Sequence, residues 1–278
     1  MSAMLDYNAT RLSVTAAGHD TNVHRAGEGA PVALLHGSGA GVSAWANWRK
    51  VIAPLSAQFD IVAPDIAGFG ATEMKPDTQY NIMLWVEHFV GVLDALGLEK
   101  VSVVGNSFGG ALGLMTAINH PERIDRLVLL GTPCGRFPLT DGLRAQGEFD
   151  GTMDSLRRAM SFFPHDPSFV TEDLIQARFE AATRDGALEA FRKLMPPPEG
   201  EAPIVRGIPE KMLRTVKHPA LILHGREDRL VPYERALDMH QWLENSQLHS
   251  FGKCGHWVQI EREAAFLKLV TDFLGEDA

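Results

Sequence analysis

The stretch VSVVGNSFGG, residues 101–110, sets a serine between glycines directly after a run of β-favouring residues. Residues 105–109 match the pattern G-x-S-x-G, in which Ser107 would occupy a tight turn from a buried strand into a helix. Small neighbours let the backbone approach closely, and the strained turn holds the serine oxygen above the edge of a sheet. Since a five-residue pattern recurs by chance, the strand before it and the helix after it carry the prediction. We predict a nucleophile elbow; the alternative is a glycine-rich turn that only packs a helix on a strand.

Apolar runs alternate with segments of helical periodicity on both sides of this elbow. Such alternation is typical of an α/β fold with a mostly parallel sheet covered by helices on both faces, and we expect eight strands. The expected strands lie at 11–16, 21–27, 31–37, 59–70, 100–105, 124–131, 220–225 and 247–252, with a Gly-His-Asp turn joining the first two. The expected helices lie at 81–97, 107–120, near 234–243 and from about 261.

The middle of the chain lacks this alternation. Residues 134–213 contain amphipathic helical segments such as MDSLRRAMSFF, a break at MPPPEGEAP, and no convincing buried strand. About eighty strandless residues between βα units are hard to place in a sheet. We therefore expect residues 1–133 and 214–278 to form the core domain and 134–213 an inserted helical cap, rather than ordinary surface helices.

The composition excludes several classes of protein. The chain of 278 residues carries 26 basic and 35 acidic residues, a formal net charge of −9, and no basic run, which argues against nucleic acid or an anionic membrane as partner. Cys134 and Cys254 form no metal or disulfide framework, so no metal is expected. No P-loop pattern occurs, and no cofactor is expected. The first ten residues lack a charged-then-apolar pattern, which favours a cytoplasmic protein without a signal peptide.

A serine hydroxyl is a poor nucleophile unless a base takes its proton. In a fold with this elbow, the acid and the histidine follow the serine in that order along the chain. Asp228 and His256 each come just after an apolar strand, so both are expected on loops at the sheet edge that holds Ser107. The predicted triad is Ser107, Asp228 and His256, with Glu227 as the second candidate acid.

The segment LLHGSGAG, residues 34–41, follows the third expected strand. It resembles an oxyanion loop of the His-Gly-Gly-Gly type, with Ser38 at the second glycine position. The backbone N–H groups of Ser38 and Phe108 are the expected oxyanion donors, whereas a merely flexible loop is the alternative. His36 fits a structural role in bracing the loop better than that of a second base.

The order HGSGAG, DIAGFG, GNSFGG, GREDRLVP and CGHW resembles the α/β-hydrolase fold over nearly the whole chain. More narrowly, GSGAGVSAWANWR, VGNSFGG and CGHWVQIE resemble the meta-cleavage product hydrolases of bacterial aromatic degradation. That resemblance implies hydrolysis of a carbon–carbon bond in 2-hydroxy-6-oxo-hexa-2,4-dienoates, the ring-fission products of catechols. The products would be 2-hydroxypenta-2,4-dienoate and a carboxylic acid.

The resemblance also implies residues for substrate binding. Arg178, in DLIQARFE of the cap, would hold the substrate carboxylate with help from Asn47 and Asn106, because a guanidinium matches a planar carboxylate. Trp257 would form pocket wall near the dienoate. Solvated surface charge is the alternative for Arg178, and plain core packing is the alternative for Trp257.

In the implied reaction, the dienol first becomes a dienone, with His256 moving the proton, and Ser107 then attacks the distal ketone. Attack by a serine-activated water is the open alternative. Phe108 and the segment GTPCGRFPLTDGL resemble the branch that accepts hydrogen or small alkyl groups, so 2-hydroxymuconic semialdehyde or its alkyl analogues are expected before phenyl ketones. Relatives commonly form dimers or higher assemblies, so a homo-oligomer acting on a small molecule is expected.

Two other functions stay open at this stage. A carboxylic ester hydrolase or perhydrolase would use the same triad without benefit from a substrate carboxylate. A ligand-binding receptor that kept a hydrolase shell is the alternative from outside the enzymes. Haloalkane dehalogenases and epoxide hydrolases are disfavoured because they carry aspartate where this chain has Ser107. Fold alone does not choose among these functions.

Overall fold

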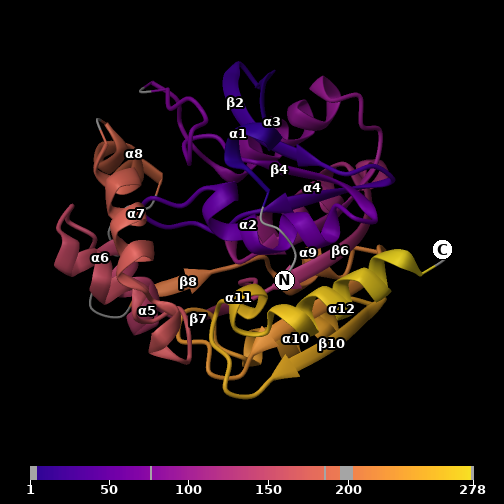
Figure 1. The fold of residues 1–278 in the computed structure, drawn as a ribbon. Helices are drawn as coiled ribbons and strands as arrows, with labels where there is room; N and C mark the ends of the chain where they lie inside the picture. The colour runs from indigo at the N-terminus through magenta and orange to yellow at the C-terminus, as the bar shows by residue number, and fades with distance from the viewer. Residues whose placement is uncertain (1–4, 76, 185, 195–202, 277–278) are drawn as a thin grey trace.

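An eight-stranded sheet forms the centre of the molecule in the computed structural model, which describes residues 5–75, 77–184, 186–194 and 203–276 (Figure 1). The strand order is β1-β2-β4-β3-β5-β6-β9-β10. Strand β2 pairs antiparallel with β1 and β4, and every pair from β4 to β10 is parallel. The prediction of a mostly parallel eight-stranded sheet is therefore confirmed. The strands are β1 (Arg11–Ala16), β2 (His19–Ala26), β3 (Ala30–Leu35), β4 (Phe59–Pro64), β5 (Val101–Asn106), β6 (Ile124–Leu130), β9 (Ala220–Gly225) and β10 (Ser246–Phe251).

Burial explains the two kinds of strand sequence. Every residue of β4, β5 and β9 is buried, as expected of strands covered on both faces and made of continuous apolar runs. The edge strands β1 and β10 instead alternate between more and less exposed residues along most of their length.

The turn between β1 and β2 differs from the prediction. Ala17 and Gly18 make the turn with positive φ angles of 45° and 77°, while His19 and Asp20 already belong to β2. The His19 ring is buried, and its Nδ1 lies 3.1 Å from the backbone oxygen of Glu73. This long-range contact favours pairing of His19 over its use in a turn.

Helices cover both faces of the sheet. One face carries α2 (Ala44–Leu55), α11 (Val258–Glu261) and α12 (Glu263–Gly275), with Trp48 and Phe266 buried in its apolar cluster. The other face carries α3 (Ile82–Ala95), α4 (Phe108–Asn119), α9 (Glu210–Leu213) and α10 (Glu234–Trp242). The short α1 (Tyr7–Thr10) contacts β2, and the 3₁₀ turn η1 (Pro121–Arg123) precedes β6.

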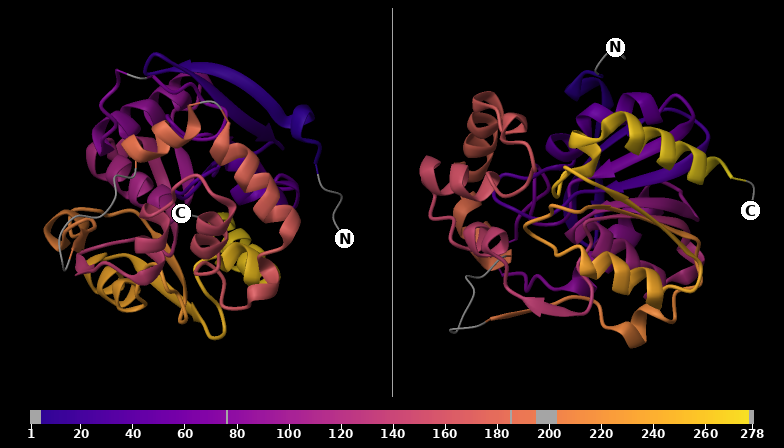
Figure 2. Two further views of the ribbon diagram at one scale, coloured as in Figure 1. Left: turned by 90° about the vertical axis from the view of Figure 1, so that its left-hand side faces the viewer. Right: turned by 90° about the horizontal axis from the view of Figure 1, so that it is seen from below.

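Between β6 and β9 the chain forms a group of helices beside the sheet (Figure 1 and the right-hand view of Figure 2). The group comprises α5 (Asp141–Gly147), α6 (Met153–Met160), η2 (Pro167–Phe169), α7 (Glu172–Thr183) and α8 (Ala187–Leu194). Two strands that the sequence did not indicate, β7 (Arg136–Pro138) and β8 (Ile204–Arg206), pair antiparallel. Three residues each are too few to show a period of two. The break expected at 195–203 lies outside the described residues except for residue 203.

Buried histidines make the stability depend on pH. Burial lowers the pKa of His36, His88 and His224, that of His88 to about 3. The same side chains in the unfolded chain bind a proton near pH 6.5. Below pH 6.5 the unfolded state therefore binds more protons than the folded state, and stability falls as the pH drops toward 3. We expect His88 to contribute a slope of up to about 1.4 kcal/mol per pH unit, the share of one proton, and His36 and His224 to add to the slope in the same direction.

Urea unfolding at several pH values between 7 and 5 checks this expectation. The variant His88→Gln should lose about one proton's share of the slope, roughly 1.4 kcal/mol per pH unit. The exposed His240→Gln serves as the matched control and should keep the full slope. Equal slopes for His88→Gln and the parent chain would contradict the assignment of His88 as a buried neutral ring.

Candidate active site

Ser107 lies at the junction of β5 and α4 in a strained backbone conformation. Its φ of 54° and ψ of −115° fall in a region that non-glycine residues rarely adopt. Its N–H donates to the backbone oxygen of Leu130 at 2.7 Å, which attaches the turn to the end of β6. Three surrounding positions have no room for a side chain: a Cβ would lie 2.5 Å from Gly110 at Gly105, 2.1 Å from the Leu35 oxygen at Gly109, and 2.0 Å from the Thr132 hydroxyl at Gly110. The geometry is that of a nucleophile elbow.

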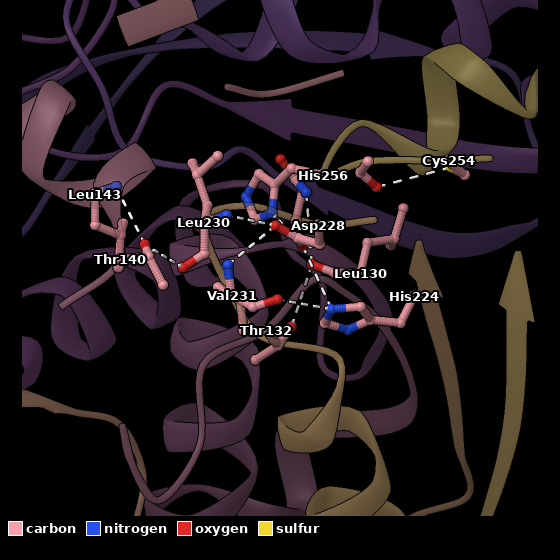
Figure 3. A network of polar contacts seen from close by, with 12 residues as sticks. Leu130, Thr132, Thr140, Leu143, His224, Asp228, Leu230, Val231, Cys254 and His256 are labelled. Atoms are coloured by element: carbon pink, nitrogen blue, oxygen red, sulfur yellow. Dashed lines mark hydrogen bonds and ion pairs between the residues drawn. The ribbon is translucent and has the colours of Figure 1, made fainter. Parts of the chain in front are cut away.

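The side chains of Asp228 and His256 form a buried hydrogen-bonded pair (Figure 3). The loop after β9 carries Asp228, and the loop after β10 carries His256, whose Nδ1 lies 2.7 Å from Oδ2 of Asp228. The other carboxylate oxygen accepts the backbone N–H groups of Leu230 at 2.8 Å and Val231 at 3.0 Å. Burial alone would raise the pKa of Asp228, but its hydrogen bond to His256 and the nearby imidazoles hold that pKa below its usual value. The carboxylate is thus kept ionised against the imidazole ring.

Glu227, the second candidate acid, faces elsewhere. Its carboxylate accepts the backbone N–H of Cys254 at 3.0 Å, a bond that lowers the pKa of Glu227. The structure therefore joins the histidine to Asp228 and uses Glu227 to hold the loop in front of His256.

Gly131, at the end of β6, brings the elbow and the imidazole to one place. It follows Leu130, which accepts the Ser107 N–H, and its own φ is 51°. A Cβ on Gly131 would lie 2.8 Å from Nδ1 of His256 and 3.2 Å from Oδ2 of Asp228. The ends of β5, β6, β9 and β10 thus meet at one edge of the sheet, as expected for ligand sites in parallel sheets.

The loop after β3 lies directly against the elbow. A Cβ on Gly37 would lie 3.5 Å from the Ser107 Cβ and 3.2 Å from Oδ1 of Asn106. The fully buried His36 accepts the N–H of Ile66 at Nε2, 3.0 Å, so its Nδ1 donates to the Gly37 oxygen at 2.7 Å. Both ring nitrogens are occupied, which supports the bracing role expected for His36. Ser38, half-buried, follows Gly37 in this loop, and Phe108, directly after Ser107, is the first residue of α4.

Arg178 is buried and not a solvated surface residue. It lies on α7 with 8% of its surface exposed, and within the described part of the chain its Nε has no hydrogen-bond partner. Burial lowers its pKa to about 10, so the guanidinium stays charged at neutral pH. Its carbonyl oxygen would lie 2.2 Å from a Cβ on Gly41, and its Nη2 would lie 3.5 Å from a Cβ on Gly39. Gly39 and Gly41 of the loop after β3 thus allow α7 to place a buried cation beside that loop.

The other predicted binding residues, Asn47, Asn106 and Trp257, differ in the contacts that their side chains make. Asn47 on α2 has an Nδ2 atom that is buried and unpartnered among the residues the structure describes. Asn106, at 2% exposure, donates from Nδ2 to the Leu130 oxygen at 3.4 Å. Trp257 stacks on Phe163 at 4.9 Å and joins an apolar cluster with residues of α6, α7 and α8, so it packs against the helices beside the sheet.

Two residues that orient the imidazole were missed in the sequence. The Glu261 carboxylate accepts the N–H of Gly255 at 2.9 Å and that of His165 at 2.8 Å, and so ties the loop of His256 to the segment after α6. Nε2 of His224 lies 3.4 Å from Asp228 and donates to the Val231 oxygen at 3.0 Å. The acid four residues after CGHW and the histidine in LILHG were visible in the sequence, but only their partners in the structure show their role.

A strained serine at a strand-to-helix turn, with a buried carboxylate–imidazole pair at the same sheet edge, defines the class of serine-type α/β hydrolases. In agreement, a family model described as alpha/beta hydrolase fold matches residues 30–160 and 155–263.

Comparison with known proteins narrows this class. The chain is 46% identical to 2-hydroxy-6-oxo-2,4-heptadienoate hydrolase of Pseudomonas putida, covering 95% of this chain and 96% of that protein. It is 44% identical to 2-hydroxymuconate semialdehyde hydrolase of a Pseudomonas species, covering 95% and 93%. The solved structure of a mutant meta-cleavage product hydrolase from Pseudomonas fluorescens, complexed with acetates, matches with a TM-score of 0.89 at 40% identity over 95% and 97% of the two chains.

The chain therefore belongs to the meta-cleavage product hydrolases of the α/β-hydrolase fold family. It is a serine-type hydrolase that acts on carbon–carbon bonds in the degradation of aromatic compounds. No helix within the described ranges is long and apolar enough to span a membrane.

Proposed function

We propose that this enzyme hydrolyses 2-hydroxymuconic semialdehyde or 2-hydroxy-6-oxo-hexa-2,4-dienoates with a small 6-alkyl group. The observation that carries the proposal is the buried Arg178 guanidinium, which stays charged and finds no carboxylate partner among the described residues. A buried charge without a partner is costly, and a substrate carboxylate would pair it. An ordinary ester hydrolase has no use for such a cation beside the oxyanion loop.

The comparisons support a small substituent. The relatives at 42–46% identity are named as heptadienoate and muconate semialdehyde hydrolases. By contrast, the solved 2-hydroxy-6-oxo-6-phenylhexa-2,4-dienoate hydrolase from a Rhodococcus species is 30% identical, with a TM-score of 0.85. We therefore propose for this chain the substrates that the names of the more similar relatives give.

In the proposed mechanism, Arg178, Asn47 and Asn106 bind the carboxylate end of the dienol, and Trp257 forms wall beside the diene. His256 moves the 2-hydroxyl proton to carbon 5, which converts the dienol into a dienone. This step is needed because an unconjugated carbanion is a poor leaving group. The new keto acid can accept the electron pair of the bond that breaks.

The same histidine then takes the proton of Ser107, whose oxygen attacks the 6-ketone. The N–H groups of Ser38 and Phe108 stabilise the oxyanion, and Asp228 stabilises the imidazolium. Cleavage of the bond between carbons 5 and 6 releases 2-hydroxypenta-2,4-dienoate. Water activated by the imidazole hydrolyses the acyl-serine to the carboxylic acid and restores the serine.

We also propose that residues 134–213 form a cap over this site. The loops after β3 and β10 touch this segment, since Gly41 lies against Arg178 and the N–H of His256 donates to the Phe163 oxygen at 2.7 Å. A cleft of about 430 Å³ between α7–α8 and the core loops, reaching Gly39 and Gly41, offers an approach for substrate. Two free cysteines agree with the proposed cytoplasmic location. We also propose that the enzyme forms a homo-oligomer.

A substrate series tests the proposed function. The enzyme should cleave the hydrogen and methyl forms of the dienoate with a kcat/KM at least tenfold above that of the phenyl form. The measurement follows the loss of the yellow dienol absorbance across the series. A preference for the phenyl ketone would overturn the small-substituent assignment, and no turnover of any dienol would overturn the proposed function.

The variant Arg178→Gln tests the carboxylate site. It should lower kcat/KM for the dienoate by about 10²-fold or more, because a charge-assisted bidentate pair contributes roughly 3 kcal/mol. The loss on a simple nitrophenyl ester should be much smaller, since that substrate carries no carboxylate. The exposed Arg192→Gln on α8 is the matched control. Equal losses on both substrates would contradict a carboxylate-specific role.

A further inference from the structure

A small internal cavity lies between the oxyanion loop and the helices beside the sheet. Its volume is about 10 Å³, which is room for one oxygen-sized group. Its wall is apolar apart from two side chains, Gln146 of α5 and Arg178 of α7; the other lining residues are Gly39, Ala40, Phe149, Leu156, Ala159, Met160 and Phe163.

Gln146 brings a polar atom to this cavity without a partner. The side chain is only 5% exposed, and within the described residues its Oε1 has no hydrogen bond. Oε1 would lie 3.2 Å from a Cβ on Gly39, the glycine that also faces Nη2 of Arg178 at 3.5 Å. An acceptor and a cationic donor therefore flank the same residue of the oxyanion loop.

These two groups do not satisfy each other. Oε1 of Gln146 and Nε of Arg178 both stay unpartnered in the part of the chain that the structure describes, although both residues line one cavity. A buried polar atom left without a hydrogen bond is destabilising, and most such atoms in folded proteins find a partner. Gln146 and Arg178 would both be satisfied by a ligand that presents an anion to the guanidinium and a hydrogen-bond donor to the amide oxygen.

We propose that Gln146 is a specificity-determining residue whose Oε1 accepts a hydrogen bond from the 2-hydroxyl group of the dienoate while Arg178 binds the adjacent carboxylate. The inference rests on the proposed function and deepens it. In a 2-hydroxydienoate the hydroxyl oxygen and the carboxylate are on neighbouring carbons, so one ligand end presents both. The cavity has room for the hydroxyl and little more.

An amide oxygen accepts from a hydroxyl but not from a ketone, so this contact holds the bound dienol and the product and is given up when His256 takes the 2-hydroxyl proton. Gln146 therefore distinguishes the 2-hydroxy form, in both substrate and product, from ligands that lack the proton at this position. A carboxylate ligand without the hydroxyl would still pair with Arg178 but would leave Oε1 unpartnered, and it would bind more weakly.

Removal of the hydroxyl from the ligand and of the amide from the protein tests the contact. The probes are fresh 2-hydroxypenta-2,4-dienoate and penta-2,4-dienoate, used as competitive inhibitors of dienol cleavage. We expect the parent enzyme to bind the hydroxylated compound about tenfold more tightly, the value of one good hydrogen bond. In Gln146→Leu this ratio of inhibition constants should fall to about one.

Two controls keep the test decisive. Gln176→Leu, at an exposed glutamine of α7, should keep the tenfold ratio. Gln146→Met, an unbranched side chain of similar length, replaces Gln146→Leu if the latter does not fold. An unchanged ratio in the folded Gln146 variant would overturn the proposal and would indicate that the amide binds a water instead. Failure of the parent enzyme to cleave the dienol would instead count against the proposed function.

Discussion

Replacement of Ser107 by alanine is expected to lower kcat for the dienol by at least about 10⁴-fold, the order seen when a serine nucleophile is removed. The variant should keep the conformation of the elbow, because alanine has the same Cβ atom as serine and that atom faces the same neighbouring glycine, Gly37. It keeps Ser38, Phe108 and Arg178, so it should still bind the substrate. Only the covalent step is lost, and the affinity for dienoate inhibitors should change little.

Stopped-flow absorbance of the yellow dienol measures this loss. Ser102→Ala, a buried serine on the same strand, is the matched control and should retain activity. Circular dichroism should show equal folded content in both variants. Unchanged decay of the dienol in Ser107→Ala would eliminate the mechanism with serine as nucleophile.

Asp228→Asn is expected to lower kcat by about 10³–10⁴-fold through the tautomer of His256. Oδ1 of Asp228 accepts two backbone N–H groups, from Leu230 and Val231. In the variant the amide oxygen must take that place, so the NH₂ group faces Nδ1 of His256. The ring then carries its proton on Nε2 and cannot accept the serine proton.

The same loss should appear on the dienol and on a nitrophenyl ester, since both need the general base. Steady-state kinetics on the two substrates check the expectation. Glu227→Gln is the matched control, because that carboxylate accepts the Cys254 N–H and not the imidazole of His256, and its activity should fall less than tenfold. A larger loss in Glu227→Gln than in Asp228→Asn would reverse the assignment of the acid.

Much of the core could be predicted because its signature lies among adjacent residues. The apolar runs at β4, β5 and β9 and the glycines around Ser107 follow directly from burial on two faces and from backbone contact. The short strands β7 and β8 could not be predicted, since three residues carry no usable periodicity. The extent of β2 was misjudged at His19 because the ring contacts Glu73, 54 residues away.

Local pattern thus accounts for the order of the strands and helices, the elbow, and the choice of a serine, an aspartate and a histidine on loops at one edge. Hydrophobic periodicity and the steric requirement for glycine arise between residues that are close in the sequence. Both can therefore be recognised from the sequence alone. Burial of Arg178 against Gly39 and Gly41, the approach of Gln146 to that cation, and the hold of Glu261 on the loop of His256 emerge only in three dimensions. Each of these depends on how separate loops and helices pack, and the cost of an unpartnered buried group exists only once that packing has excluded water.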